Sequence, residues 1–350
     1  MRYPLAYAMP VLVVILVIVG FYRGGVGFYG SLIGLVLIMP LLDEMVGKSI
    51  WPSEQRVAEM SGRAARMYDL MLWLGAIASV GLLAWALWAA STTPLAWWQL
   101  AGLVISVGLM SGTVGIVVSH ELLHRGSPLC FPIMGLIGYS HFCITHIRSH
   151  HVVVATPDDA ASSRYGESLY AFIPRWLFGG LRAGWEIERR RLARAGRPAF
   201  SIANRSLVWH GFSLLAIPAI WLVLGPVSAL LFIGQALVAM LTLALIDYIE
   251  HYGLARARLP DGGYERVTSA HTWNCNHLLT NISLFNLGRH TAHHNRAAER
   301  YHRLGADHAA PQLPHGYAMM MLISLVPPLW FRVMHRELAA YHADRTLAPG

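Results

Sequence analysis

Charged side chains are scarce in this chain, and their scarcity argues against an ordinary soluble domain. Asp, Glu, Lys and Arg make up 13% of the 350 residues, whereas a soluble domain carries about 25%. Cysteine is nearly absent as well, and three scattered cysteines argue against a disulfide framework. No GxGxxG sequence stands between a predicted strand and a helix, so the sequence gives no sign of a bound dinucleotide cofactor.

Hydrophobic residues, in contrast, make up 55% of the chain and gather in long runs. A helix that crosses a bilayer needs about 20 predominantly apolar residues. We therefore predict an all-α integral membrane protein with about six transmembrane helices, forming one membrane domain over residues 1–350. The six predicted spans are residues 5–22, 29–42, 70–90, 100–119, 207–224 and 228–246.

The basic residues predict how the chain is oriented. With six spans, both termini and the histidine-rich regions 120–206 and 247–335 lie on one side of the membrane. All lysines and arginines except Arg23 fall on that side. Because basic residues stay cytoplasmic, we expect both termini and a histidine-rich cap to face the cytoplasm. A surface facing anionic lipids accounts for the excess of basic over acidic residues, so no nucleic-acid partner is expected.

Histidines are concentrated where apolar runs end. They occur in the sequences HELLH, HIRSHH and HTAHH, with one more in IEHYG. Imidazole is a preferred ligand for Zn, Cu, Fe and Ni. Because one zinc ion takes about four ligands, nine rings indicate two metals with open positions. The nine candidate metal ligands are His120, His124, His146, His150, His151, His251, His290, His293 and His294.

Five other residues are candidates to support these rings. Glu121, Asp247 and Glu250 flank the candidate ligands and would orient rings by accepting their second N–H, although each is also explained as an interfacial charge. His141 and His277 lie close to the clusters in sequence.

Two other classes of protein use comparable residues. HELLH matches the HExxH pattern of zinc proteases, in which Glu121 would be the general base. That reading leaves about six of the histidines without a role. A metal transporter is a second alternative, but transporters place their ligands near the bilayer midplane, whereas these histidines follow the ends of the predicted spans.

Taken with these histidines, longer segments resemble a known family. The chain is similar to the rubredoxin-linked alkane 1-monooxygenases and to the xylene monooxygenase hydroxylase subunits, within the membrane di-iron hydroxylases and fatty acid desaturases. The resemblance is densest from about residue 115 to 335. It is carried by HHVVVATPDDAASSRYGESLY from His150, DYIEHYGL from Asp247, HTWNCNHLLTN from His271, LGRHTAHHNRAAERYHRL from Leu287 and APQLPHGY from Ala310.

The resemblance implies a metal centre and a reaction. All nine histidines fall on positions of the family's iron ligands, implying two iron ions and O2 as co-substrate. The implied reaction hydroxylates a hydrophobic substrate, first of all the terminal methyl of an n-alkane to give a 1-alkanol. The alternative is another apolar methyl group, on an aryl (xylene-type), terpene or fatty-acyl substrate. Thr145 and Ser149 stand where alkane hydroxylases usually have Glu and Gly, which leaves the substrate open.

The resemblance also implies partners and a location. Electrons would come from an iron–sulfur donor, a rubredoxin or ferredoxin with its NAD(P)H reductase, since the chain carries no rubredoxin CxxC pairs of its own. The arginine-rich residues 189–197 are a candidate docking face for that donor, or simply a solvated surface. The expected location is the inner (cytoplasmic) membrane of a bacterium.

Overall fold

The computed structural model describes residues 4–49 and 61–347, and regular structure in these ranges is helical apart from isolated β-bridges. Within these ranges, five helical runs are long and apolar enough to cross a membrane. They are Pro4–Arg23 (η1, Pro4–Ala8, and α1, Met9–Arg23), α4 (Gly62–Thr92), Trp97–His124 (α5, Trp97–Met110, η4, Ser111–Gly115, and α6, Ile116–His124), α11 (Arg205–Leu224) and α12 (Pro226–His251).

Shorter helices connect these runs and build the polar end of the molecule. Apart from α10 and α16, none exceeds eight residues. They are η2 (Gly25–Tyr29), η3 (Leu32–Ile38), α2 (Met39–Val46), α7 (Cys130–Ile137), α8 (Phe142–Thr145), η5 (His146–His150), α9 (His151–Val153), α10 (Leu169–Arg194), η6 (Ser269–His271), α13 (Leu278–Ser283), α14 (His290–Asn295), η7 (Tyr301–Arg303), α15 (Tyr317–Ser324) and α16 (Pro327–Leu347).

The all-helical membrane architecture predicted from the sequence is confirmed. Five of the six predicted runs coincide with the apolar helices, whereas residues 29–42 are divided between η2, the π-helix η3 and α2. Gly24 and Gly25 both have positive φ and end α1, and Pro40 lies in the first turn of α2. A sixth span stays a prediction.

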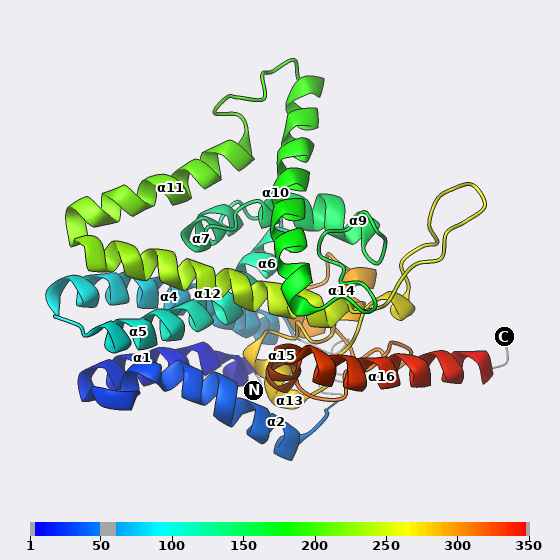
Figure 1. Cartoon of the computed structure of the whole chain (residues 1–350), viewed down its shortest axis with the longest axis horizontal. Helices are drawn as coiled ribbons and strands as arrows, with labels where there is room; N and C mark the ends of the chain where they lie inside the picture. Colours follow the sequence, from blue (N-terminus) through cyan, green and yellow to red (C-terminus); the bar gives the residue numbers. More distant parts are fainter. Residues whose placement is uncertain (1–3, 50–60, 348–350) are drawn as a thin grey trace.

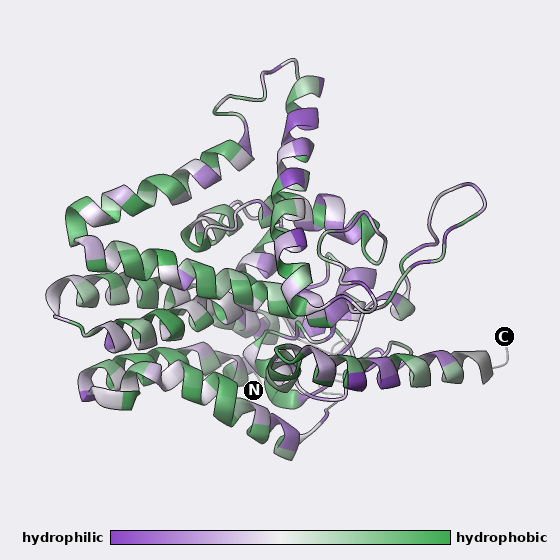
Figure 2. Cartoon of the chain, viewed as in Figure 1, coloured by the Kyte–Doolittle hydropathy of each residue, from purple (hydrophilic) through white to green (hydrophobic). Residues whose placement is uncertain are grey.

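The long helices form the body of the molecule. In Figure 1, α1, α4, α5 and α12 run alongside one another, α11 crosses beside α12, and α10 stands upright against them. Figure 2 shows hydrophobic residues along these long helices, and hydrophilic residues on the outer turns of α10 and around α9 and α14. On α11, Leu222 and Val223 are 85% and 80% exposed, as expected for a helix face that contacts lipid.

A pair of glycines lets α12 approach α5 closely. Gly108 and Gly112 stand four residues apart, in the GxxxG spacing that favours tight helix packing in membranes. A Cβ atom at Gly108 would lie 2.5 Å from Val238 Cβ, and one at Gly112 would lie 2.6 Å from Thr242 Cβ. The close contact holds the C-terminal end of α12, which carries His251, beside α6, which carries His120 and His124.

A buried carboxylate fixes the far end of α10. The Glu188 side chain has no exposed surface and accepts hydrogen bonds from the Arg191 and Arg205 guanidinium groups and from the Arg205 backbone N–H. These bonds tie α10 to the start of α11. They also hold the pKa of Glu188 down at about 2, although burial alone would raise it.

Candidate metal centre

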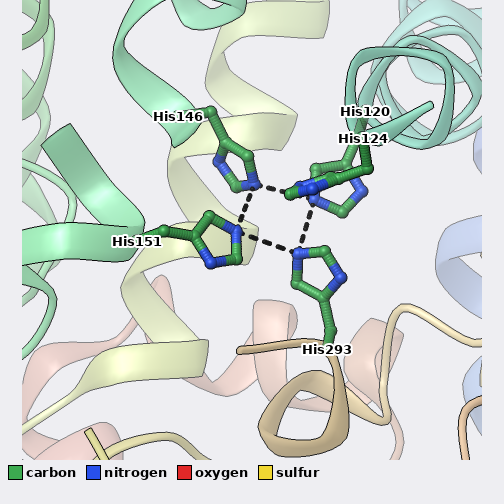
Figure 3. A group of neighbouring side chains, drawn as sticks. All are labelled: His120, His124, His146, His151 and His293. Atoms are coloured by element: carbon green, nitrogen blue, oxygen red, sulfur yellow. Dashed lines mark hydrogen bonds between the residues drawn. The ribbon is translucent and has the colours of Figure 1, made fainter. Parts of the chain in front are cut away.

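The structure brings all nine candidate histidines together, in two groups. In each group, one candidate ligand atom from every residue lies within 4.8 Å of the others. Figure 3 shows the rings of the first group pointing toward a common centre. The first group is His120, His124, His146, His151 and His293, and the second is His150, His251, His290 and His294.

Local helix geometry divides the HIRSHH histidines between the groups. His146–His150 form one turn of π-helix, followed by α9. A π-helix bonds residue i to i+5 rather than i+4, so His146 and His151 point into the first group while His150 points into the second. In α14 the ordinary α-helical spacing pairs His290 with His294, one turn apart, and turns His293 toward the first group.

The ring nitrogens converge in a way that hydrogen bonding alone cannot satisfy. His120 Nε2 lies 2.8 Å from His146 Nε2 and 3.1 Å from His293 Nε2, and His151 Nε2 lies 3.1 Å from both of the same atoms. A ring nitrogen either donates or accepts, so only two of these four contacts can be hydrogen bonds. His124 Nε2 is buried with no hydrogen-bond partner. A cluster of lone pairs such as this fits a bound cation.

Burial keeps the rings of the first group neutral. It lowers the pKa of His146 and His293 well below the usual value, and neighbouring histidines lower it further. Burial and the nearby His150 lower the pKa of His151 to about 2. Because a metal binds the unprotonated nitrogen, rings with these pKa values are ready to ligate at neutral pH.

A buried carboxylate bonds one ring of the second group, and another buried carboxylate lies near a second ring. His150 Nδ1 donates to Asp159 Oδ2 at 2.8 Å, and both side chains are buried. Burial disfavours the imidazolium, but the Asp159 carboxylate outweighs it, so the pKa of His150 is raised. His290 Nδ1 lies 3.4 Å from Glu250 Oε1, and Glu250 accepts a 2.8 Å hydrogen bond from the Tyr317 hydroxyl.

The other predicted supporting residues have different partners. Glu121 accepts two hydrogen bonds from the Arg125 guanidinium, at 3.0 and 2.8 Å. Asp247 accepts one from Trp176 Nε1 at 2.7 Å. The first contact stays at the end of α6, between residues four apart, whereas the second ties α12 to α10. Of the three predicted carboxylates it is Glu250 that faces a ring.

The two predicted histidines outside the groups also bond elsewhere. His141 Nδ1 lies 3.3 Å from His210 Nε2. His277 Nε2 lies 3.6 Å from the Glu44 carboxylate, which connects it to α2. Neither belongs to the two histidine groups.

Sequence reasoning missed Asp159 and Tyr317. Asp159 stands nine residues beyond His150, in the loop that follows α9, and no helical spacing connects the two. Tyr317 is 67 residues from Glu250. Both lie in or beside segments that carry the family resemblance, and that was the one signal for them.

An apolar cavity extends from the spans toward the histidines. It encloses about 220 Å³ between α1, η3, α2, α5, α12, α13 and α15. A smaller cavity of about 20 Å³ touches His120, His146 and His290. Ile246 lines both cavities, and Tyr317, which lines the larger, bonds Glu250, which lines the smaller. These residues separate the apolar space from the metal centre.

Comparisons with known proteins agree with this architecture. Residues 95–324 match the family model described as fatty acid desaturase. Alkane 1-monooxygenase 2 of Pseudomonas aeruginosa is 41% identical over 87% of this chain and 82% of that protein. Alkane 1-monooxygenase 2 of Alcanivorax borkumensis is 38% identical over 87% of this chain and 81% of that protein. The xylene/toluene monooxygenase hydroxylase component of Pseudomonas putida is 26% identical over 95% and 88% respectively. The chain therefore belongs to the fatty acid desaturase family and, within it, to the alkane 1-monooxygenases.

Proposed function

We propose that this integral membrane protein is a di-iron monooxygenase that hydroxylates the terminal methyl of n-alkanes. The observation that carries the proposal is the pair of all-histidine groups beside a small cavity that shares Ile246 with the apolar cavity between the spans. The overall reaction consumes a hydrocarbon, O2, two electrons and two protons, and it yields a 1-alkanol and water.

The two histidine groups would each hold one iron ion. His120, His124, His146, His151 and His293 offer five nitrogens to one ion, and His150, His251, His290 and His294 offer four to the other. Imidazole suits iron as a ligand. When bound, the irons supply O2 activation and the oxidising power that an unactivated C–H bond requires.

The chain's own residues orient and shield that centre. Asp159 accepts the Nδ1 proton of His150 and thereby leaves Nε2 free to ligate. Glu250, held by Tyr317, faces Nδ1 of His290 and favours the same tautomer there. Apart from the partly exposed His124, His151 and His294, the rings are buried, which limits their contact with bulk water.

The apolar cavity would bind the hydrocarbon chain and direct its end toward the histidines. Its lining includes Met9, Val13, Leu109, Ile246 and Met321, so a hydrocarbon bound there would contact mainly hydrophobic side chains. An apolar pocket gains or loses only about 1–3 kcal/mol per methylene. We therefore expect several chain lengths to be accepted.

Hydroxylation of an aryl methyl group is the second candidate function. Thr145 and Ser149 replace the residues usual in alkane hydroxylases, and one relative is a xylene/toluene monooxygenase component. Ser149 and Thr145 line a cleft that also reaches His146 and His150. Product analysis with xylene beside octane separates the two functions.

Electrons would come from a rubredoxin or ferredoxin on the cytoplasmic side of a bacterial inner membrane. The exposed arginines of residues 189–197 support docking of an acidic donor. Arg189 and Arg190 are partly neutralised by Glu186, whereas Arg194 and Arg197 are exposed. The predicted orientation, with both termini in the cytoplasm, puts this face and the histidines on the same side.

One assay tests the proposed function directly. Purified protein is loaded with iron and supplied with rubredoxin, its reductase, NAD(P)H and a panel of octane, hexadecane and xylene. We expect 1-octanol whose oxygen derives from O2, and about two irons per chain by elemental analysis. Iron-loaded protein that forms no oxygenated product from any of the three would refute the proposal.

A further inference from the structure

A second cavity reaches the histidines from the side of α10. It encloses about 590 Å³ between α10 and the segment of residues 139–161. His146 of the first group and His150 of the second both line it. It therefore touches both histidine groups, by a route separate from the apolar cavity between the spans.

The lining of this cleft is mixed, with several charged side chains beside apolar ones, unlike that of the cavity between the spans. Asp158, Arg164, Arg182 and Arg190 are exposed at its outer rim, and the buried Asp159 lies inside. A polar cavity of this size holds water rather than remaining empty, and about 30 Å³ per molecule gives it room for on the order of 20 waters.

The inner end of the cleft meets the small cavity beside the metal centre. Phe142, His146 and Asp247 line both. Trp176, which is 3% exposed, donates to Asp247 and fixes its carboxylate at this junction. Ile246 lines both the small cavity and the apolar one, and the next residue, Asp247, lines both the small cavity and the cleft. Two adjacent residues of α12 therefore connect the apolar cavity with the cleft.

We propose that this cleft is the water-side entrance of the metal centre, which admits the two protons that hydroxylation consumes and releases the water it forms. The proposal rests on the proposed monooxygenase function, because that reaction fixes the proton and water balance. The apolar cavity is less suited to this purpose, because hydrophobic side chains dominate its lining and no charged side chain of the described residues lines it. The ring nitrogens of the first group do not form a route for protons either, because they converge on the metal position.

Cysteine labelling tests the proposal. The three native cysteines are buried, so a bulky, doubly charged maleimide should react only with an introduced thiol. Ala183→Cys places one in the cleft, Ala318→Cys places one in the apolar cavity, and Ala340→Cys places one on the exposed surface of α16. Mass spectrometry measures labelling in metal-free and iron-loaded protein, and alcohol formation is measured before and after labelling.

We expect Ala183→Cys to be labelled at a rate within tenfold of Ala340→Cys, and Ala318→Cys to resist the charged reagent. Labelling Ala183→Cys should lower kcat at least tenfold and leave KM for the electron donor unchanged, whereas labelling Ala340→Cys should change neither. The proposal is overturned if Ala183→Cys is not labelled, if its labelled form keeps its kcat, or if only the donor KM rises. Failure of the proposed function is distinguishable, because unlabelled wild-type protein would then form no alcohol.

Discussion

Replacing Asp159 by asparagine tests how the second histidine group is held. The carboxylate accepts from three donors: His150 Nδ1 and the Ser162 hydroxyl bond Oδ2, and the Ala161 N–H bonds Oδ1. The asparagine amide has the same shape, but only its oxygen accepts hydrogen bonds, while its NH2 group donates them. The NH2 must therefore face one of these N–H or O–H groups. If it faces His150, the ring changes tautomer and Nε2 becomes protonated, which removes its lone pair from the metal.

Loss of a carboxylate that supports a ligand ring costs about 10–100-fold in metal affinity or activity. That range corresponds to roughly 1.4–2.7 kcal/mol. For Asp159→Asn we therefore expect iron to be lost at chelator concentrations 10–100-fold below those needed for wild type. Elemental analysis across a chelator series measures this loss, and product formation should fall in parallel.

The neighbouring residue provides a matched control. Asp158 is exposed, and Asp158→Asn makes the same chemical change one position away, so we expect wild-type iron retention. The thermal unfolding midpoint of the metal-free proteins checks that Asp159→Asn is folded. A folded Asp159→Asn protein that retains iron exactly as Asp158→Asn does would show that the 2.8 Å contact with His150 does not support the metal.

Three further predictions concern the cavity and the helix packing. Ala318→Trp fills part of the apolar cavity and should lower the ratio of hexadecane to octane hydroxylation at least tenfold; an unchanged product ratio from gas chromatography would contradict it. Glu188→Gln removes a carboxylate whose pKa is lowered to about 2, so it should destabilise the fold by roughly 2 kcal/mol at neutral pH. This energy is smaller than the pKa shift alone would give, because water screens the partly exposed arginine partners. The wild type should lose this contribution as the pH falls from the pKa that the carboxyl has in the unfolded chain toward about 2. Thermal melts measure the loss, and the surface control Glu186→Gln should change the melting midpoint little. Gly112→Val forces a side chain into α12 and should cost about 1–3 kcal/mol by overpacking, whereas Gly211→Ala, with nothing within 4 Å of the new Cβ, should not lower the melting midpoint.

Much of the architecture could be predicted because it depends on composition along the chain. Long apolar runs have few alternatives to a buried or lipid-facing helix, so five of the predicted spans fall within the long apolar helices, whose ends extend up to eight residues further. Residues 29–42 were harder, because Gly24 and Gly25 end α1 just before them and the π-helix η3 occupies half of the segment. Of the predicted carboxylates, Glu250 faces a ligand ring, whereas Glu121 and Asp247 bond Arg125 and Trp176. Adjacency in sequence did not decide which carboxylate faces a ring.

The sequence alone determined that nine imidazoles follow the ends of apolar helices, since both helix formation and metal ligation depend on residue type and local spacing. It did not determine how those rings are shared. One π-helical turn sends His146 and His151 to one group and His150 to the other, and α14 divides its histidines in the same way. Only the tertiary structure decided that partition, together with the Asp159 contact and the two cavities, because each depends on packing between helices far apart along the chain.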